Sequence, residues 1–330
     1  MKSNETIIMQ PENNSFNPHI SVVIPVYMAE HCLDELYRRL KTSLESISAN
    51  FEILMIEDCG GDNSWHVIQR LALADSRVRG IKFSRNFGQH PGITAGLNIC
   101  NGEWVVVMDC DLQDRPEAIP SLYAKAQEGF DVVLARRGQR SDSLLKRITS
   151  KVFYKIFSYL ADMEYDGECG NFRIMSRKVV VNFRRLEEQL RFFGGLVQWM
   201  GFPTSSINVD HAERLHGKST YTFAKLWKLA VETIISHSDK PLRLTMRLGF
   251  LMAFFSFCYG SFILVNAFLY GANIRGWSSM IVSLYFIGGI IIAILGIIGI
   301  YLGKTFNESK KRPLYIIQSV TFPEGGKEDK

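Results

Sequence analysis

The C-terminal third of the chain contains two long stretches without a charged side chain. Residues 248–272 and 277–303 supply 25 and 27 consecutive uncharged residues, and Arg275 in the link is the only charge of the region. About 20 apolar residues suffice to cross the ~30 Å hydrocarbon core of a bilayer. Because the link is only four residues long, the sequence predicts a transmembrane hairpin within residues 241–306. The alternative, a pair of buried core helices, is disfavoured because both stretches are long and contain no charged residue.

Basic residues flank the outer ends of the two stretches, whereas the link carries only Arg275. The flanking residues are Lys240, Arg243 and Arg247 before the first stretch and Lys304, Lys310, Lys311 and Arg312 after the second. Positively charged flanks stay on the cytoplasmic side of a membrane. We therefore expect a multi-pass protein of the inner, cytoplasmic membrane, with both termini and the large domain in the cytoplasm.

The remaining chain has the composition of an ordinary globular domain. It holds all but one of the 38 Lys and Arg and 33 Asp and Glu residues, and the net charge of the chain is +5. We expect residues 1–19 to be a disordered tail, residues 20–240 to fold as an α/β domain, and residues 307–330 to be a cytoplasmic tail. Six scattered cysteines without a Cys-x-x-Cys pair argue against a zinc site or a disulfide scaffold.

Short apolar runs alternate with amphipathic segments of helical length in the globular region. The runs lie at residues 20–24, 51–56, 78–83, 104–108 and 131–135, and the amphipathic segments include residues 32–47 and 65–74. This alternation predicts a Rossmann-like, mostly parallel sheet with helices on both faces. Ligands of such sheets bind at the carboxyl ends of the strands, so the residues after each run are the first candidates for a site.

Two common nucleotide-binding motifs are absent or incomplete. Residues 25–30, which follow the first run, contain no glycine, so the GxGxxG turn of dinucleotide-binding enzymes is missing. Gly217-Lys218-Ser219 resembles the end of a P-loop, but Ala212 stands where the first glycine belongs. The sequence therefore favours neither a dehydrogenase nor an ATPase.

Acidic residues follow the second and the fourth apolar run. Glu57 and Asp58 can accept hydrogen bonds from a ribose hydroxyl or a base N–H, and a role in the turn before the next helix is equally open. Asp109 and Asp111 directly follow the fourth run. Two carboxylates at this spacing can share Mg²⁺ or Mn²⁺, with coordination positions left for a diphosphate. Asp114 is expected at the N-cap of the next helix.

The order of these motifs resembles that of family 2 glycosyltransferases, which have the GT-A fold. The matching positions are Pro25 and Tyr27, Glu57-Asp58, Asp109-Cys110-Asp111-Leu112-Gln113, residues 170–177 and residues 214–221. Together with the hairpin, they resemble the branch that contains dolichol-phosphate mannose synthase and bacterial polyprenyl-phosphate glucosyltransferases. The resemblance covers nearly the whole chain, from residue 20 to residue 312.

The resemblance implies transfer of a sugar from a nucleotide-diphosphate sugar, by default a UDP-sugar, to polyprenyl (undecaprenyl) phosphate. It implies that Asp109 and Asp111 hold the metal ion and the diphosphate, and that Gln113 lies near the phosphates or the sugar. Arg214 and Lys218 are expected to close over the diphosphate as a lid. The full set implied for nucleotide-sugar binding is Pro25, Tyr27, Glu30, Glu57, Asp58, Arg214 and Lys218.

Three positions depart from the family pattern. Glu30 lies one place later than the usual acid, Thr220 occupies the place of a common lysine, and Asn171 stands where many relatives carry aspartate. An amide cannot take a proton, but a phosphate monoester has a second pKa near 6 and is already largely ionised at neutral pH. The sequence therefore predicts an inverting single displacement in which Asn171 positions a group, with Asp166 and Glu168 as fallback bases.

A basic segment of helical length, residues 136–155, is the candidate acceptor site. Seven of its residues are basic, and Asp142 is its only acid. Apolar residues at helical spacing favour a helix in the headgroup layer with its cations on lipid phosphates; a core-packed helix with a solvated basic face is the alternative. Residues 221–235 form a second interfacial candidate. By resemblance, the residues for the acceptor phosphate are Arg137, Lys146, Arg147 and Ser150.

Two other functions stay open on the sequence. One is a glycosyltransferase that extends a lipid-linked or polymeric glycan, although Gln198-Trp199 is the nearest approach to the Gln-x-x-Arg-Trp motif of polysaccharide synthases. The other is a non-catalytic membrane protein that binds a nucleotide-sugar. The expected partners are a donor, a lipid and the membrane, with no nucleic acid. Glycines within residues 277–303 permit close helix packing, and thus a homo-oligomer.

Overall fold

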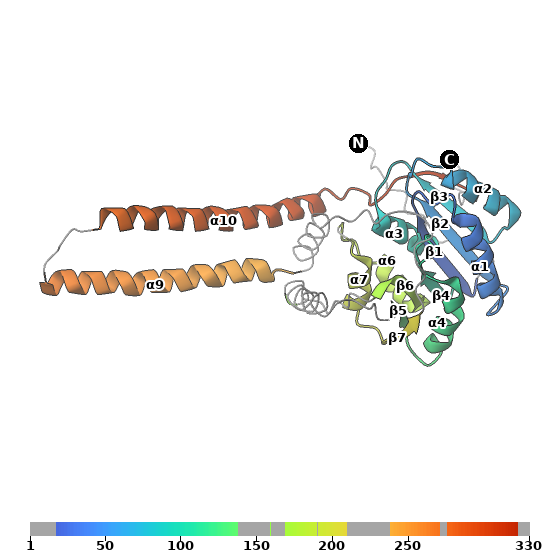
Figure 1. Cartoon of the computed structure of the whole chain (residues 1–330), viewed down its shortest axis with the longest axis horizontal. Helices are drawn as coiled ribbons and strands as arrows, with labels where there is room; N and C mark the ends of the chain where they lie inside the picture. The colour runs from blue at the N-terminus through green and yellow to red at the C-terminus, as the bar shows by residue number, and fades with distance from the viewer. Residues whose placement is uncertain are drawn as a thin grey trace, which may run out of the picture. The chain divides into compact units, whose positions relative to one another are not determined.

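The computed structural model describes residues 18–137, 159, 169–189, 191–209, 238–270 and 276–322. The chain divides into two compact units, one globular and one helical (Figure 1). The described part of the globular unit comprises residues 18–137, 169–189, 191–209 and 312–322. The described part of the helical unit comprises residues 159, 238–270 and 276–311.

The globular unit is built on one eight-stranded sheet in the order β7-β5-β6-β4-β1-β2-β3-β8. Its strands are β1 (Ile20–Val26), β2 (Phe51–Glu57), β3 (Val78–Phe83), β4 (Trp104–Val107), β5 (Val132–Arg137), β6 (Cys169–Ser176), β7 (Thr204–Val209) and β8 (Ile317–Val320). Neighbours are parallel in the pairs β1–β2, β1–β4, β2–β3 and β5–β7, and antiparallel in β4–β6, β5–β6 and β3–β8. Only β6 and β8 run against the other strands of this sheet, so the prediction of a mostly parallel sheet is confirmed.

Helices cover both faces of this sheet (Figure 1). The described helices are α1 (Leu33–Glu45), α2 (Ser64–Ala74), α3 (Gln89–Ile99), the 3₁₀ helix η1 (Pro116–Ala118), α4 (Ile119–Ala126), α6 (Arg177–Arg184), α7 (Phe193–Trp199), α9 (Lys240–Tyr270) and α10 (Trp277–Ser309). One buried cluster lies between the sheet and α1, α2 and α4, and a second lies between the sheet and α3, α6 and α7. Successive strand residues point to opposite faces, so Val22 and Ile24 join the first cluster and Val23 the second.

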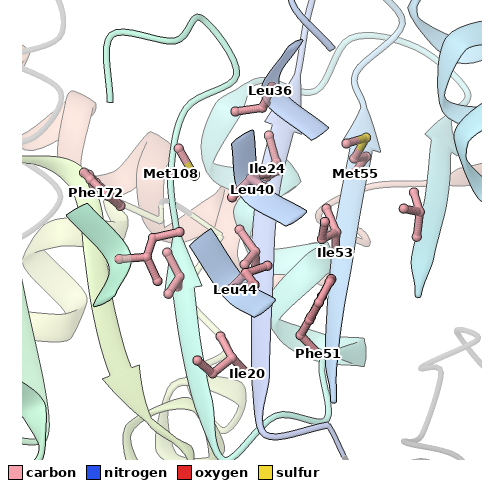
Figure 2. Packing of buried hydrophobic residues seen from close by; sticks show 14 of the residues in the cluster. Ile20, Ile24, Leu36, Leu40, Leu44, Phe51, Ile53, Met55, Met108 and Phe172 are labelled. Carbon is pink, nitrogen blue, oxygen red and sulfur yellow. The ribbon is translucent and has the colours of Figure 1, made fainter. Parts of the chain in front are cut away.

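Helix α1 packs on the sheet through a stripe of leucines. Leu33, Leu36, Leu40 and Leu44 recur at intervals of three and four residues, which is the spacing of one helix face, and all four are fully buried. Figure 2 shows the last three of them spread along β1, with Leu40 next to Ile24. Burial of each such side chain stabilises the fold by about 1.5–3 kcal/mol, so this stripe fixes α1 on its face of the sheet.

Helix α3 lies closer to the sheet than an alanine at position 96 would allow. A Cβ on Gly96 would lie 2.3 Å from Cγ1 of Val23 and 2.9 Å from Cδ1 of Ile56. A Cβ on Gly92 would lie 3.3 Å from Cβ of Pro25, near the end of β1. The missing side chains let the helix backbone rest directly on β1 and β2, and this contact holds the first turn of α3 at the carboxyl edge of the sheet.

The predicted apolar runs coincide with β1 to β5 to within two residues at either end. The first run is two residues short because β1 continues through Pro25. Pairing of β1 with β4 ends at Val23. The ladder between β1 and β4 therefore does not need the backbone N–H that Pro25 lacks.

The segment that follows α10 contains a strand of the globular sheet. Residues 307–330 are expected to be a tail, but β8 within them pairs antiparallel with β3, and Val320 is level with Ile81. The β-branched residues Ile316, Ile317 and Val320 form a strand-like pattern. A partner strand far away in the sequence converts that weak local preference into structure.

The helical unit contains the two long apolar helices α9 and α10, which lie side by side (Figure 1). Their segments Lys240–Phe262 and Phe286–Ser309 have mean hydropathies of 1.2 and 2.5, and neither is buried within the unit. By length and composition, both are able to cross a membrane. The predicted spans fall on these two helices.

Candidate active site

The candidate residues Tyr27, Asp58 and Asp109 lie just beyond the carboxyl ends of β1, β2 and β4. These strands are parallel neighbours, and Val26 of β1 is paired with Glu57 of β2. Parallel strands carry their ends to the same edge of a sheet. The three segments that the sequence singles out are therefore together at one edge.

The loop after β4 is held in shape by its own carboxylates. The backbone N–H of Gln113 donates to Oδ1 of Asp111 at 3.1 Å, and the backbone N–H of Asp109 donates to Oδ2 of Asp114 at 3.4 Å. Leu112 adopts a left-handed conformation with a φ of +61°, and its side chain is buried. The buried leucine anchors the turn, so the two aspartates on either side of Cys110 stay at the edge.

Asp114 supports this loop and does not cap the following helix as the sequence predicts. Helix η1 begins at Pro116, with Arg115 in the N-cap position and no side-chain cap hydrogen bond. The side chain of Asp114 is buried and turns back to the backbone of Asp109. This N–H lies beyond the end of β4, where it would otherwise lack a ladder partner, and an orphaned backbone donor is costly.

Gln89, which the sequence analysis does not single out, contacts the first aspartate of the pair. Its side-chain Nε2 donates to Oδ1 of Asp109 at 2.6 Å. Gln89 is the first residue of α3, and Gly88 before it has a φ of +100°, a conformation that favours glycine. The signal in the sequence is positional but weak, since Gln89 comes six residues after the end of β3, whereas Asp58 directly follows β2.

The carboxylate of Asp58 holds the backbone of the loop between β3 and α3. Asp58 is buried, and its Oδ1 and Oδ2 accept the backbone N–H groups of Phe87 at 2.7 Å and Gly88 at 2.8 Å. Burial raises the pKa of Asp58, and the two N–H donors oppose that rise because they favour the charged form. Both oxygens are engaged by protein, so Asp58 fixes the neighbouring loop at the edge.

Glu57 is buried beside Asp58, and only one of its two oxygens has a hydrogen-bond partner in the described part of the chain. Its Oε1 accepts the backbone N–H of Gly60 at 2.7 Å. Its Oε2 has no such partner there, and the side chain is only 2% exposed. A buried polar atom without a partner costs about 1–3 kcal/mol. A bound molecule could satisfy this oxygen with a hydroxyl or an N–H once the atoms that cover it shift.

Glu30 ties the loops after β1 and β2 together. Its Oε2 accepts the backbone N–H of Asn63 at 2.8 Å, and its own backbone N–H donates to Oδ2 of Asp62 at 3.1 Å. Tyr27 and Met28 project from this pair of loops with 51% and 63% exposure, and Met28 has a φ of +50°. The ring of Tyr27 is thus available for stacking at the sheet edge.

The antiparallel strand β6 places Asn171 near the carboxyl end of β4. The last pair of the β4–β6 ladder is Val107 with Arg173, and Asn171 lies two residues beyond that pair on β6. Arg173 is buried and donates from Nη2 to the carbonyl oxygen of Gly170 at 2.8 Å and from Nε to that of Asn171 at 3.2 Å. The guanidinium therefore fixes the backbone at Asn171, a task that sequence spacing does not reveal.

Asp109 and Asp111 have the donor chemistry for a hard divalent cation. Carboxylate oxygens are ligands that Mg²⁺ and Mn²⁺ accept, and Mg²⁺ typically keeps waters and substrate phosphates as its other ligands. Burial raises the pKa of the Cys110 thiol to about 12, and a thiol is a softer ligand than Mg²⁺ or Mn²⁺ prefers. Two carboxylates suit a cation that takes its remaining ligands from water and a diphosphate.

Part of the site expected from the sequence lies outside the described residues. These positions are Lys146, Arg147, Ser150, Asp166, Glu168, Arg214, Lys218 and residues 221–235. Arg137 is the last residue of β5. The described part of the site is the edge formed by the ends of β1, β2 and β4, the start of α3 and the start of β6.

Several known proteins are similar in sequence to this chain over nearly its whole length. The Bacillus subtilis (strain 168) protein named "Uncharacterized glycosyltransferase YkcC" is 40% identical, over 90% of this chain and 93% of that protein. The "Prophage bactoprenol glucosyl transferase homolog" of Escherichia coli (strain K12) is 38% identical, over 91% of this chain and 99% of that protein. The "Bactoprenol glucosyl transferase" of Shigella phage SfV is also 38% identical, over 91% of this chain and 98% of that protein.

A family model and a solved structure are similar to the globular unit. Glucosyl-3-phosphoglycerate synthase from Mycobacterium tuberculosis, solved with Mn²⁺, UDP and phosphoglyceric acid, has 16% identity and a TM-score of 0.47 over 66% of this chain and 77% of that chain. The model described as "Glycosyl transferase family 2" matches residues 21–184, which contain the described carboxyl edge from Tyr27 to Asn171. With relatives at about 40% identity, the chain belongs to glycosyl transferase family 2 and is a glycosyltransferase.

Proposed function

We propose that this glycosyltransferase moves a sugar from a nucleotide-diphosphate sugar, a UDP-sugar, to polyprenyl phosphate at the cytoplasmic face of the inner membrane. The observation that carries the proposal is the extent of the match to proteins named bactoprenol glucosyl transferase. A match over 91% of this chain has to include most of α9 and α10 as well as the globular unit. A lipid-phosphate acceptor accounts for both parts of the chain.

The carboxyl edge supplies groups for the donor. Tyr27 offers an exposed ring on which a base can stack, and Oε2 of Glu57 can accept a hydroxyl or an N–H of the nucleoside. The carboxylates of Asp109 and Asp111 would hold the divalent cation, Mg²⁺ or Mn²⁺, with Gln113 close to the phosphates or the sugar. When bound, such a cation neutralises charge on the departing nucleoside diphosphate.

The nucleophile is an oxygen of the acceptor phosphate itself. A phosphate monoester with a second pKa near 6 is largely a dianion at neutral pH, so its oxygen attacks the anomeric carbon without a protein base. The bond from that carbon to the diphosphate oxygen breaks, its electron pair leaves with the nucleoside diphosphate, and the configuration inverts. Asn171, two residues beyond the last β4–β6 pair, positions the sugar or the acceptor phosphate by hydrogen bonds and takes no proton.

The acceptor phosphate and the lid are assigned to basic residues that the sequence singles out. Arg137, Lys146, Arg147 and Ser150 would bind the lipid phosphate, and Arg214 and Lys218 would close over the diphosphate. The excess of basic residues at the outer ends of α9 and α10 supports a cytoplasmic globular unit.

A transfer assay with the full chain tests the proposal. Purified protein in detergent receives radiolabelled UDP-glucose, polyprenyl phosphate and Mn²⁺, and label in the butanol-extractable lipid is counted. We expect product for the wild type and a loss on the order of 10²–10³-fold for Asp109→Asn and Asp111→Asn. Glu128→Gln, which changes an exposed acid at the end of α4, is the matched control and is expected to leave the rate unchanged.

The same assay separates the other functions. Full transfer by the Asp109→Asn/Asp111→Asn double variant would contradict the assigned roles. Label that enters only a preassembled lipid-linked glycan would support chain extension, and nucleotide-sugar binding without transfer to any acceptor would support a non-catalytic protein.

A further inference from the structure

The chain returns to the globular unit after α10. Residues 312–322, named here the C-terminal clip, belong to that unit and include β8. In the ladder with β3, Phe83 is level with Ile317. The backbone N–H of Ser84 donates to the carbonyl oxygen of Ile316 at 3.0 Å. The clip therefore touches the chain at the point where β3 ends and the loop toward α3 begins.

Tyr315 is the aromatic residue of the clip nearest to this point. Its ring stacks on Phe83, with ring centres 5.1 Å apart and an interplanar angle of 15°. Its hydroxyl accepts a hydrogen bond from Nδ2 of Asn98 in α3 at 3.0 Å. Tyr315 is thus fixed to the last residue of β3 and to the helix that follows the loop.

The contacts continue from Phe83 to the carboxylates of the site. Residues 84–89, named here the donor loop, contain Phe87, whose ring meets Phe83 edge to face at 5.6 Å and 85°. The backbone N–H groups of Phe87 and Gly88 bind the carboxylate of Asp58, and the side chain of Gln89 binds Asp109. The path from Tyr315 to Asp109 consists of packed rings and hydrogen bonds in one unit.

The outer part of the donor loop is held by little besides these contacts. Ser84, Arg85 and Asn86 are exposed, and the guanidinium of Arg85 lies over the ring of Phe87 at 4.1 Å. Fixing a backbone segment costs conformational entropy that contacts have to offset. In this loop the ring of Phe87 provides the packing, and its position depends on Phe83 and thus on Tyr315.

We propose that Tyr315 is a positioning residue for the donor site, acting through Phe83 and Phe87 on the donor loop. By fixing that loop, it sets the N–H groups that hold Asp58 and the Gln89 side chain that holds Asp109. Tyr315, which follows the two long apolar helices in the sequence, thus acts on the nucleotide-binding loop, whereas the far end of β8 does not. The identity of the ligand in this statement rests on the proposed function.

The clip could instead serve only to cover the edge of β3, as native sheets commonly require. The two roles are separable because β8 is attached at both ends. At the far end, Oγ1 of Thr321 accepts the backbone N–H of Gly80 at 2.8 Å. Thr321→Val removes this hydrogen bond, which lies away from the donor loop. It is therefore the matched control, because it weakens the attachment of the clip to β3 without changing Tyr315.

The experiment compares Tyr315→Leu, Tyr315→Phe and Thr321→Val in the full chain, in detergent with Mn²⁺. We expect Tyr315→Leu to raise the Kd for UDP and the KM for the UDP-sugar about fivefold or more, with the KM for polyprenyl phosphate unchanged. Amide hydrogen exchange at Phe87 and Gly88 should become about tenfold faster. Tyr315→Phe keeps the ring and should restore most of the affinity, and Thr321→Val should lower Tm without changing either KM.

Three results would overturn the inference: a UDP Kd for folded Tyr315→Leu within about twofold of the wild type, an equal effect of Thr321→Val, or unchanged exchange at Phe87 and Gly88. If Tyr315→Leu does not fold, Tyr315→Met, which also removes the ring that stacks on Phe83, is judged by the same exchange measurement. If Tyr315→Leu exchanges faster at Phe87 and Gly88 but the wild type binds no UDP, the donor assignment is refuted. The role of Tyr315 in positioning the loop is then still supported. Normal UDP binding with no effect at Tyr315 would refute the positioning role alone.

Discussion

The side-chain nitrogen Nε2 of Gln89 lies 2.6 Å from Oδ1 of Asp109 and donates a hydrogen bond to it. The first residue of α3 thus touches the first carboxylate after β4, although the two residues are 20 positions apart. The bond fixes one oxygen of Asp109. A carboxylate held in one orientation loses less entropy when it binds a cation.

Replacing Gln89 by leucine should weaken the reaction without unfolding the protein. A hydrogen bond to a charged group contributes about 1.5–3 kcal/mol, so we expect kcat/KM for the UDP-sugar to fall by about tenfold to a hundredfold. Gln89→Glu should be worse, since it sets a second negative charge beside Asp109. Gln127→Leu, an exposed glutamine just after α4, is the control. Equal rates for the wild type and Gln89→Leu would show that the bond has no part in catalysis.

Asn171→Asp tests whether the amide at this position is an adaptation to an ionised acceptor. The new carboxylate would add a negative charge just beyond the last β4–β6 pair and repel the incoming phosphate. We expect transfer to polyprenyl phosphate to fall or to stay the same, measured as label in extracted lipid, with Asn171→Ala as the comparison. A many-fold gain would mean that the native residue is a handicap and would refute its positioning role.

Nucleotide binding should depend on a divalent cation through the two aspartates. Titration calorimetry with UDP is expected to give tight binding with Mn²⁺ and a loss of binding on the order of tenfold or more with EDTA, because the diphosphate charge is then unbalanced. Asp111→Asn should bind UDP equally weakly in both conditions. Equal UDP affinity of the wild type with Mn²⁺ and with EDTA would argue against a cation on Asp109 and Asp111.

The burial of Asp58 predicts a definite pH dependence of stability. Because its folded-state pKa is raised above the ordinary value, which is about 3.9, the folded protein binds this proton more tightly than the unfolded chain. The stabilising contribution of Asp58 is therefore present below that ordinary pKa and is lost as pH rises through the raised one. Thermal unfolding in detergent should show a Tm difference between wild type and Asp58→Asn that is smaller at neutral than at acidic pH. A difference that widens toward neutral pH would mean that the N–H groups of Phe87 and Gly88 outweigh burial.

Gly96→Ala should destabilise the protein by overpacking. The added Cβ would lie 2.3 Å from Cγ1 of Val23, and extra methyl groups in a tight core cost about 1–3 kcal/mol. The Tm should fall by several degrees. Gly249→Ala, where nothing lies within 4 Å of the added atom, is the control. An unchanged Tm for Gly96→Ala would show that α3 can shift away from β1.

The sheet and the aspartate pair were predictable from the sequence because both have local signals. A buried β-branched run followed directly by Asp109 and Asp111 identifies a strand end with acids, and parallel strands bring such ends together. The amphipathic spacing of Leu36, Leu40 and Leu44 identifies α1 in the same way. These features depend on residues that are close in sequence.

The partners of the site residues were not predictable because they come from distant segments. Nothing near Asp58 in the sequence indicates that the backbone of Phe87 and Gly88 will occupy its oxygens, and nothing near Asp109 points to Gln89. Asp114 has the sequence pattern of a helix cap, yet its side chain instead accepts the backbone N–H of Asp109. In each case the carboxylate binds a donor from another part of the fold, and that donor is known only once the strands are assembled.

The edge of the sheet at β3 is completed by a strand that follows both apolar helices in the sequence. Gly80 and Thr321 are hydrogen-bonded across 241 positions of chain, and both apolar helices are translated between them. The nascent chain consequently has an open sheet edge at β3 until β8 has been synthesised. A stop codon before Ile317 would therefore leave that edge unpaired.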